Sequence, residues 1–236
     1  MILTVVENKL IALNTYKMTL KGNFKLAPKP GQFINIQIPG LYLRRPISVC
    51  DYQKNKLTII YKIVGKGSEI LSQFNANTKL DCLVNLGNGY NLNNRNKNIV
   101  LIGGGAGVPP LYYLAKSLKQ KCDIILAFNS KNDAFYINEF KKISKRVYIT
   151  TMDGSIGIKG TALEALKNKR YDYFYTCGPL KMMEAISKIL PHGECSLEER
   201  MGCGFGACMG CTHQFKSGNK RICKEGPVFK AEDIIW

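Results

Sequence analysis

Hydrophobic and polar residues alternate along the first part of the chain. After a turn at residues 25–31, the segment 34–38 reads Ile-Asn-Ile-Gln-Ile, which is the pattern of a half-buried strand. The segment 57–64 is rich in β-branched and aromatic residues, which favours a second strand. Because such short strands are separated by Gly and Pro and helical spacing is rare, we expect residues 1–95 to form a small antiparallel β-barrel.

The pattern changes period after residue 95. Short apolar runs now alternate with segments in which apolar residues recur at helical spacing. The expected strands are 98–102, 123–128, 147–150 and 171–175, and the expected helices are 111–118, 162–166 and 180–189. This alternation predicts a parallel, doubly wound α/β sheet over residues 96–190, with its ligand at the carboxyl ends of the strands. Residues 191–236 are too few to bury much core, so we expect a small domain that needs a bound group to fold.

The C-terminal segment contains a cysteine pattern with the spacing of an iron–sulfur site. Cys203, Cys208 and Cys211 stand as C-x4-C-x2-C, and Cys223 follows after eleven residues, which is the spacing of plant-type [2Fe–2S] ligation. Intervening glycines allow the loop to double back around a cluster. Zinc is the alternative, but structural zinc prefers two separated pairs of ligands and only one C-x2-C pair is present. Disulfides need an oxidising compartment, and no secretory signal opens the chain.

Two segments of the predicted α/β domain are candidates for nucleotide binding. Gly103, Gly105 and Gly107 alternate directly after a strand, and Pro109-Pro110 opens the following helix. The loop therefore lies at the edge where a dinucleotide would bind, although it is not the full G-x-G-x-x-G fingerprint. The second segment, Thr176-Cys-Gly-Pro179, also ends a strand. An ordinary strand-to-helix turn with a buried Cys is its simpler interpretation.

Two segments of the predicted barrel could bind phosphate. In Arg45-Pro46-Ile47-Ser48, an Arg beside a Pro with a nearby hydroxyl can hold a pyrophosphate and a ring edge together. In Gly65-Lys-Gly67-Ser68, a glycine turn precedes an apolar run, which indicates a helix start with Ser68 at the N-cap. Exposed N–H groups at a helix start bind phosphate, but a cap without a ligand is the alternative.

Composition and charge add little to this assignment. The chain of 236 residues has 34 Lys and Arg against 17 Asp and Glu, giving a net charge of +17. The lysines are scattered rather than gathered in aromatic-bearing stripes, so we do not expect nucleic-acid binding. A basic surface suits anionic phosphate cofactors and an acidic partner subunit. No apolar run approaches the length of a membrane span, and we expect a cytoplasmic protein that does not bind membranes.

The order of these features resembles the ferredoxin–NADP reductase superfamily. The added cysteine module, and above all the stretch 197–211, resembles one family within it, the electron transfer subunits of dihydroorotate dehydrogenase B. The resemblance implies FAD in the barrel, held by Arg45, Pro46, Ile47, Ser48, Ile60, Tyr61, Lys62, Gly67 and Ser68. It implies NAD across Gly103, Gly105, Gly107 and Pro110, with Cys177, Gly178 and Pro179 near the nicotinamide. It implies a [2Fe–2S] cluster on Cys203, Cys208, Cys211 and Cys223.

The resemblance also implies a function and a partner. Electrons from dihydroorotate would leave the FMN of a separate catalytic subunit, pass through the [2Fe–2S] cluster to FAD and reduce NAD in pyrimidine (UMP) biosynthesis. No side-chain acid or base is required, and the family assembles as a heterotetramer with two of each chain. An NAD(P)H–ferredoxin oxidoreductase or sulfide dehydrogenase small subunit is the alternative. A redox-sensing regulator is a third interpretation, but a sensor needs neither nucleotide-binding region.

Overall fold

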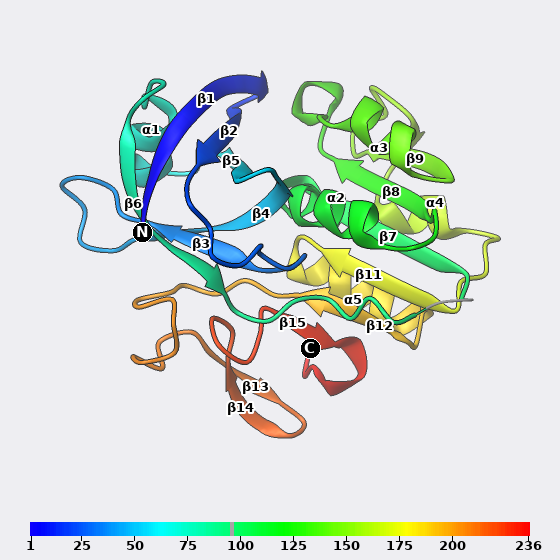
Figure 1. Cartoon of the computed structure of the whole chain (residues 1–236). Coiled ribbons are helices and arrows are strands. Elements are labelled where there is room, and N and C mark those ends of the chain that lie inside the picture. Colours follow the sequence, from blue (N-terminus) through cyan, green and yellow to red (C-terminus); the bar gives the residue numbers. More distant parts are fainter. Residues whose placement is uncertain (95–96) are drawn as a thin grey trace.

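A closed antiparallel barrel forms the N-terminal part of the chain (Figure 1). The computed structural model describes residues 1–94 and 97–236, so the predicted boundary between 95 and 96 lies outside the described residues. The barrel strands are β1 (Ile2–Ala12), β2 (Thr15–Lys21), β3 (Phe33–Ile36), β4 (Arg45–Gln53), β5 (Lys56–Lys62) and β6 (Lys79–Leu86), in the order β1-β2-β5-β4-β3-β6. The predicted barrel is confirmed.

Strand β3 differs from the predicted half-buried strand. Ile34 and Ile36 face the barrel core as expected, but Asn35 on the opposite face is fully buried as well. The Asn35 amide donates a hydrogen bond of 3.3 Å to the backbone carbonyl of Cys203, which lies far away in the sequence. Polar side chains on a strand usually mark a solvated face. Here the C-terminal segment covers that face.

A parallel sheet forms the second part. Its strands are β7 (Ile99–Gly104), β8 (Asp123–Phe128), β9 (Arg146–Thr151), β10 (Ile158–Lys159) and β11 (Tyr173–Cys177). Its helices are α2 (Val108–Ser117), α3 (Ile137–Ile143), α4 (Ala162–Leu166) and α5 (Leu180–Ile189), with 3-10 turns η1 (Gly105–Gly107) and η2 (Lys131–Asp133). Helices α2 and α3 pack on one face of the sheet, and α4 and α5 pack on the other, which confirms the predicted α/β layers (Figure 1).

The C-terminal segment continues this sheet before it forms a separate hairpin. Strand β12 (Gly193–Ser196) pairs in parallel with β11, and β15 (Val228–Lys230) pairs antiparallel with β12. Between them lie the cysteine loop and the hairpin of β13 (Thr212–Phe215) and β14 (Gly218–Arg221), and the 3-10 turn η3 (Ala231–Asp233) follows β15. The segment is therefore joined to the α/β sheet by backbone hydrogen bonds, which the sequence did not indicate. Within residues 1–94 and 97–236, none of the helices combines the length and apolar character of a membrane span.

Candidate cofactor sites

A cavity of about 570 Å³ lies where the barrel meets the carboxyl edge of the parallel sheet. Its volume is in the ordinary range for a small-molecule or cofactor site. The cavity is lined by all three parts of the chain: by β4 and β5 of the barrel, by the strand ends of the α/β domain, and by the end of β12 with the segment that follows it. This last group consists of Ser196, Leu197, Glu198, Glu199 and Met201. Ligands of open α/β sheets bind at this edge.

The cavity brings together many of the residues that the sequence predicted. From the barrel it is lined by Pro46, Ser48, Ile60, Tyr61 and Lys62, and from the sheet edge by Gly105, Gly107, Cys177, Gly178 and Pro179. The predicted residues Arg45, Ile47, Gly67, Ser68, Gly103 and Pro110 are not part of the lining. The sequence did not indicate three further lining residues: Phe33 in β3, Met152 directly after β9 and Thr161 at the N-cap of α4. No local motif marks these three residues.

The glycine loop and the Cys-Gly-Pro turn are packed against each other at the sheet edge. A Cβ atom on Gly107 would lie 2.2 Å from the carbonyl oxygen of Cys177, and one on Gly104 would lie 2.9 Å from the ring of Pro179. Gly105 has a φ of +51°, and a Cβ there would meet no other atom within 4 Å in the described part of the chain. The loop therefore needs glycine for two reasons: close backbone packing at Gly107 and a left-handed conformation at Gly105. The open space around Gly105 fits the approach of a pyrophosphate to the backbone.

Arg45 and Gly67 also lie together, beside the cavity. A Cβ on Gly67 would lie 2.2 Å from Nε of Arg45, so the guanidinium packs directly on the start of helix α1 (Lys66–Ser72). The predicted N-cap is wrong: Gly65 is the N-cap and Ser68 is the third residue of the helix. The reason is local, because the Ser68 hydroxyl reaches back and accepts hydrogen bonds from the N–H groups of Val64 and Gly65 at 2.9 and 3.2 Å.

An ion pair crosses from the barrel to the sheet domain at the cavity wall. Lys62 Nζ lies 2.8 Å from Oδ1 of Asp133, and the Ser130 hydroxyl donates to Oδ2 of the same carboxylate at 2.7 Å. The hydrogen bond from Lys62 is the main cause that lowers the pKa of Asp133 below its ordinary value, against the effect of burial. Asp133 is therefore ionised at neutral pH and holds Lys62 at the edge of the cavity.

The four predicted cluster ligands form two pairs. The N–H of Cys203 points at Sγ of Cys208 at 3.4 Å, and the N–H of Cys208 points at Sγ of Cys203 at 3.5 Å. The N–H of Cys223 in turn points at Sγ of Cys211 at 3.4 Å. Across the described residues, no three Cys, His, Asp or Glu side chains converge tightly enough to enclose a single metal ion. Two thiol pairs fit a cluster with two irons better than one zinc ion.

The backbone of the cysteine loop favours a thiolate at Cys203. Burial raises the pKa of Cys203, but hydrogen bonds from the N–H groups of Cys208, Phe205 and Ala207 outweigh it and lower the pKa to about 6. For Cys223, burial and the adjacent Cys211 thiol raise the pKa to about 12. Neighbouring thiols thus resist ionising together, and the positive charge of bound iron is what would hold all four as thiolates. The donors and the N–H groups fit an iron–sulfur cluster.

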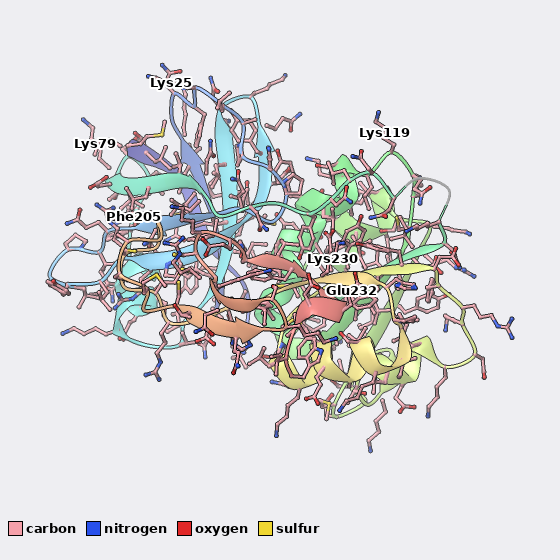
Figure 2. All side chains as sticks on the ribbon, turned by 90° about the horizontal axis from the view of Figure 1, so that it is seen from below. Lys25, Lys79, Lys119, Phe205, Lys230 and Glu232 are labelled. Carbon is pink, nitrogen blue, oxygen red and sulfur yellow. The ribbon has the colours of Figure 1, made fainter. Side chains whose placement is uncertain are left out.

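The cysteine loop lies at the surface beside the barrel. Phe205 and Met209, within the loop, have 54% and 53% of their surface exposed, and Figure 2 shows Phe205 on this loop beside the barrel. Cys208 is exposed, whereas Cys211 and Cys223 are buried beneath the loop. One edge of the thiol set therefore faces outward, and the opposite edge faces the core.

Comparisons with known proteins agree with this geometry. The sequence profile of the family described as the iron-sulfur cluster binding domain of dihydroorotate dehydrogenase B matches residues 198–235. The chain is 43% identical to the dihydroorotate dehydrogenase B (NAD(+)) electron transfer subunit of Fusobacterium nucleatum, covering 98% of this chain and 96% of that protein. It is 39% identical to the protein of the same name from a Geobacillus species, covering 99% and 97%.

Solved structures show the same architecture. A structure reported for an NADH-dependent reduced ferredoxin-NADP oxidoreductase, in a study of flavin-based electron bifurcation, superposes with a TM-score of 0.89 at 28% identity, covering 99% of this chain and 90% of that one. Phthalate dioxygenase reductase superposes with a TM-score of 0.70 at 15% identity, covering 94% and 93%. The second likeness concerns the fold alone.

Proposed function

The chain belongs to the family of dihydroorotate dehydrogenase B (NAD(+)) electron transfer subunits, and from this premise we propose which part of the chain binds each redox group. It is a subunit of a flavin and iron–sulfur oxidoreductase with FAD, NAD and an iron–sulfur cluster as its redox groups. We assign FAD to residues 1–95, NAD to residues 96–190 and the cluster to residues 191–236. The observation that carries this assignment is a cavity shared by barrel and sheet, with the cysteine loop attached to the same sheet.

The proposed FAD residues are those of β4, β5 and α1. The guanidinium of Arg45, packed on Gly67, supplies positive charge at the start of α1, where a pyrophosphate would lie. Ser48, Ile60 and Tyr61 line the cavity and would contact the flavin ring. Ile47, Pro46, Lys62 and Ser68 complete the proposed set. Arg45, Ile47, Gly67 and Ser68 do not line the cavity itself, so their proposed roles rest on the resemblance and on the Arg45–Gly67 contact.

The proposed NAD residues lie at the opposite wall. Gly103, Gly105, Gly107 and Pro110 would hold the dinucleotide at the end of β7, and Cys177, Gly178 and Pro179 would lie near the nicotinamide. Bound FAD supplies the chemistry, because a flavin exchanges a hydride with NAD and single electrons with a cluster. The chain itself would hold both groups in one cavity and keeps a bulky side chain off Gly105 and Gly107. Hydride transfer between the two groups requires no side-chain acid or base.

The proposed cluster is a [2Fe–2S] group on Cys203, Cys208, Cys211 and Cys223. The pairing of the thiols and the N–H groups directed at them support this assignment. The exposed edge at Cys208 and Phe205 is where an electron partner would approach.

The proposed partner is the FMN-containing catalytic subunit of dihydroorotate dehydrogenase, in a heterotetramer of two of each chain. Electrons from dihydroorotate would then reach NAD through this chain, in the cytoplasm and as a step of UMP synthesis. None of the nine cysteines, all of which lie in the described part of the chain, forms a disulfide, which suits a reducing compartment. The alternative, an NAD(P)H–ferredoxin oxidoreductase or sulfide dehydrogenase small subunit, has the same redox groups and a different partner.

Anaerobic co-expression with the catalytic chain tests the proposal. Dihydroorotate-dependent reduction of NAD that requires both chains, together with co-elution at the mass of two of each, is the expected result. A chain that carries flavin and cluster and oxidises NADH, but neither binds the catalytic chain nor supports this reaction, would favour the ferredoxin-linked alternative.

A further inference from the structure

The cysteine loop lies directly beside the cavity. The C-terminal segment that carries the four thiols also supplies Leu197, Met201 and Pro227 to the cavity lining. Met201 precedes Cys203 by only two residues, so their Cα atoms lie within about 8 Å of each other. A group bound in the cavity and a group bound by the thiols would therefore be close neighbours.

Strand β3 of the barrel lies at the same boundary. Phe33 and Asn35 are two residues apart, so their side chains share the face of β3 that points away from the barrel core. Phe33 lines the cavity and belongs to the same buried apolar cluster as Cys211 and Cys223. Asn35 is bonded to the backbone of Cys203. This face of β3 therefore contacts the cavity with one residue and the cysteine loop with the other.

Asn35 is a polar residue at a position that burial alone does not explain. Its side chain is fully buried, its Nδ2 donates to the Cys203 carbonyl at 3.3 Å, and its Oδ1 has no hydrogen-bond partner among the described residues. A buried amide oxygen without a partner destabilises the fold, so an apolar side chain would suit the position better if filling space were its only role. What Asn35 adds is a directional bond to the cysteine loop.

The Phe33 ring is also closely packed. A Cβ on Gly87 would lie 3.1 Å from the Phe33 ring and 2.6 Å from the ring of Pro227. In the antiparallel register, Phe33 pairs with Ser48 of β4, which also lines the cavity. The ring therefore lies beside the β4 wall of the cavity and close to the segment that follows Cys223.

A second contact holds the far end of the cysteine segment on the barrel. Asn88, two residues after β6, donates its backbone N–H to the carbonyl of Gly226 at 2.6 Å. Its Nδ2 donates to the carbonyl of Val228 at 2.7 Å, and its Oδ1 accepts from the N–H of Val228 at 3.0 Å. The segment is thus held at Cys203 by β3 and at residues 226–228 by Asn88, so the barrel sets the separation between the cavity and the thiols.

We propose that Asn35 and Phe33 are positioning residues for electron transfer between the flavin and the cluster. Asn35 holds the cysteine loop at one distance from the cavity, and Phe33 fills the space between them. The inference rests on the proposed function, which puts FAD in the cavity and the cluster on the cysteine loop. NADH delivers two electrons to the flavin as a hydride, and one of them passes on to the oxidised cluster, with no proton gained or lost by either side chain. The rate of this transfer falls steeply with the distance between the two groups, so a loop that is not held in place receives the electron more slowly.

The test compares Asn35→Ala and Phe33→Leu with the control Asn98→Ala, in the full chain loaded with FAD and cluster under anaerobic conditions. Asn98 directly precedes β7, and its Nδ2 likewise donates to a backbone carbonyl, that of Arg170. After rapid mixing with NADH, reduction of flavin and of cluster are followed separately by absorbance. In Asn35→Ala the rate of cluster reduction per loaded chain should fall about fivefold, the factor that corresponds to one neutral hydrogen bond. In Asn98→Ala this rate should not change.

A second readout reports the position of the loop without turnover. The reduced cluster is paramagnetic and broadens the nuclear magnetic resonance signals of nearby methyl groups, an effect that weakens steeply with distance. Ile34 and Ile36 flank Asn35 in β3 and can be observed through isotope-labelled methyl groups. After reduction with dithionite, their extra broadening should be largely lost in Asn35→Ala and retained in Asn98→Ala. Phe33→Leu keeps the Asn35 bond, so it should retain the broadening while the rate of cluster reduction falls by a similar factor.

Two results would overturn the inference. The first is a wild-type rate of cluster reduction in Asn35→Ala at wild-type cluster content. The second is a slower rate in Asn35→Ala with the broadening of Ile34 and Ile36 unchanged, because the loop would not have moved. If Asn35→Ala does not retain the cluster, Phe33→Leu decides, and a wild-type rate in that variant contradicts a role for this face of β3. If NADH does not reduce the cluster of the wild-type chain, the proposed function fails; if it does and both variants match the wild type, only the inference fails.

Discussion

Substitution of Gly204 by Ala should release the iron–sulfur cluster, because this residue lies where the cysteine loop touches the barrel. Gly204 has a φ of +78°, which costs an Ala residue about 1–2 kcal/mol. A Cβ would also lie 2.3 Å from Nδ2 of Asn35, a side chain that is fully buried in β3. Asn35 would have to move and give up its bond to the Cys203 carbonyl, at a further cost of about 1–3 kcal/mol. Together these two effects should destabilise the segment that positions Cys203 by about 2–5 kcal/mol.

Gly218→Ala is the matched control for this substitution. Gly218 has a φ of +100° in the hairpin of β13 and β14, and no atom of the described chain lies within 4 Å of its would-be Cβ. Ala at position 218 therefore has the energetic cost of the left-handed backbone conformation but no steric clash. Replacing Asn35 by Ala in the Gly204→Ala background removes the clash, so the double variant should lose less stability than the sum of the two single variants.

The assay is iron and sulfide content per chain after anaerobic purification, with visible absorbance and the electron paramagnetic resonance signal after reduction. We expect Gly218→Ala to retain the wild-type content and Gly204→Ala to lose most of it while FAD is retained. Equal cluster content in Gly204→Ala and Gly218→Ala would refute the reasoning, because it would show that Asn35 does not set the position of the loop.

Three further substitutions test other parts of the account. Gly107→Ala places a methyl group 2.2 Å from the carbonyl of Cys177, so KM for NADH should rise about tenfold with FAD content unchanged, as measured by steady-state kinetics. Asp133→Asn removes the partner of Lys62 and should lower the free energy of unfolding by about 1 kcal/mol at pH 7, as measured by denaturant titration. Burial raises the pKa of Glu194 above its ordinary value of 4.5. The contribution of Glu194 to the stability of the fold is therefore fully present below pH 4.5, and it is lost as the pH rises through the raised pKa of the folded state. In thermal melts, Glu194→Gln should therefore gain stability relative to the wild type between pH 4.5 and pH 8.

The fold could be predicted where the pattern of the chain is local and strong. Strand β8 and helix α5 have the predicted bounds, because each is a regular run with clear breaks on both sides. Strands β12 and β15 are only four and three residues long and show no period, so they could not be predicted to extend the sheet. The burial of Asn35 depends on a carbonyl at residue 203, which alternation within β3 cannot reveal.

Some residues of the candidate site could likewise be predicted from local sequence, whereas others could not. The spacing of Cys203, Cys208, Cys211 and Cys223 is local chemistry and could be read directly, and so could the glycine loop at the end of β7. The position of Ser196 beside Cys177 at the cavity could not be predicted, because the two residues come from strands that are adjacent only in the folded chain. Ser196 would have drawn attention only if β12 had been recognised as the neighbour of β11.

The most direct test of the account is electron transfer in the complex of this chain with its catalytic partner, measured in the wild type and in Cys208→Ala. Flavin reduction by NADH and NAD reduction by dihydroorotate are followed separately under anaerobic conditions. The account predicts that Cys208→Ala keeps FAD and its reduction by NADH but loses NAD reduction by dihydroorotate, because the exposed ligand of the cluster is gone. Dihydroorotate-dependent NAD reduction at the wild-type rate in Cys208→Ala would contradict the route through the cluster.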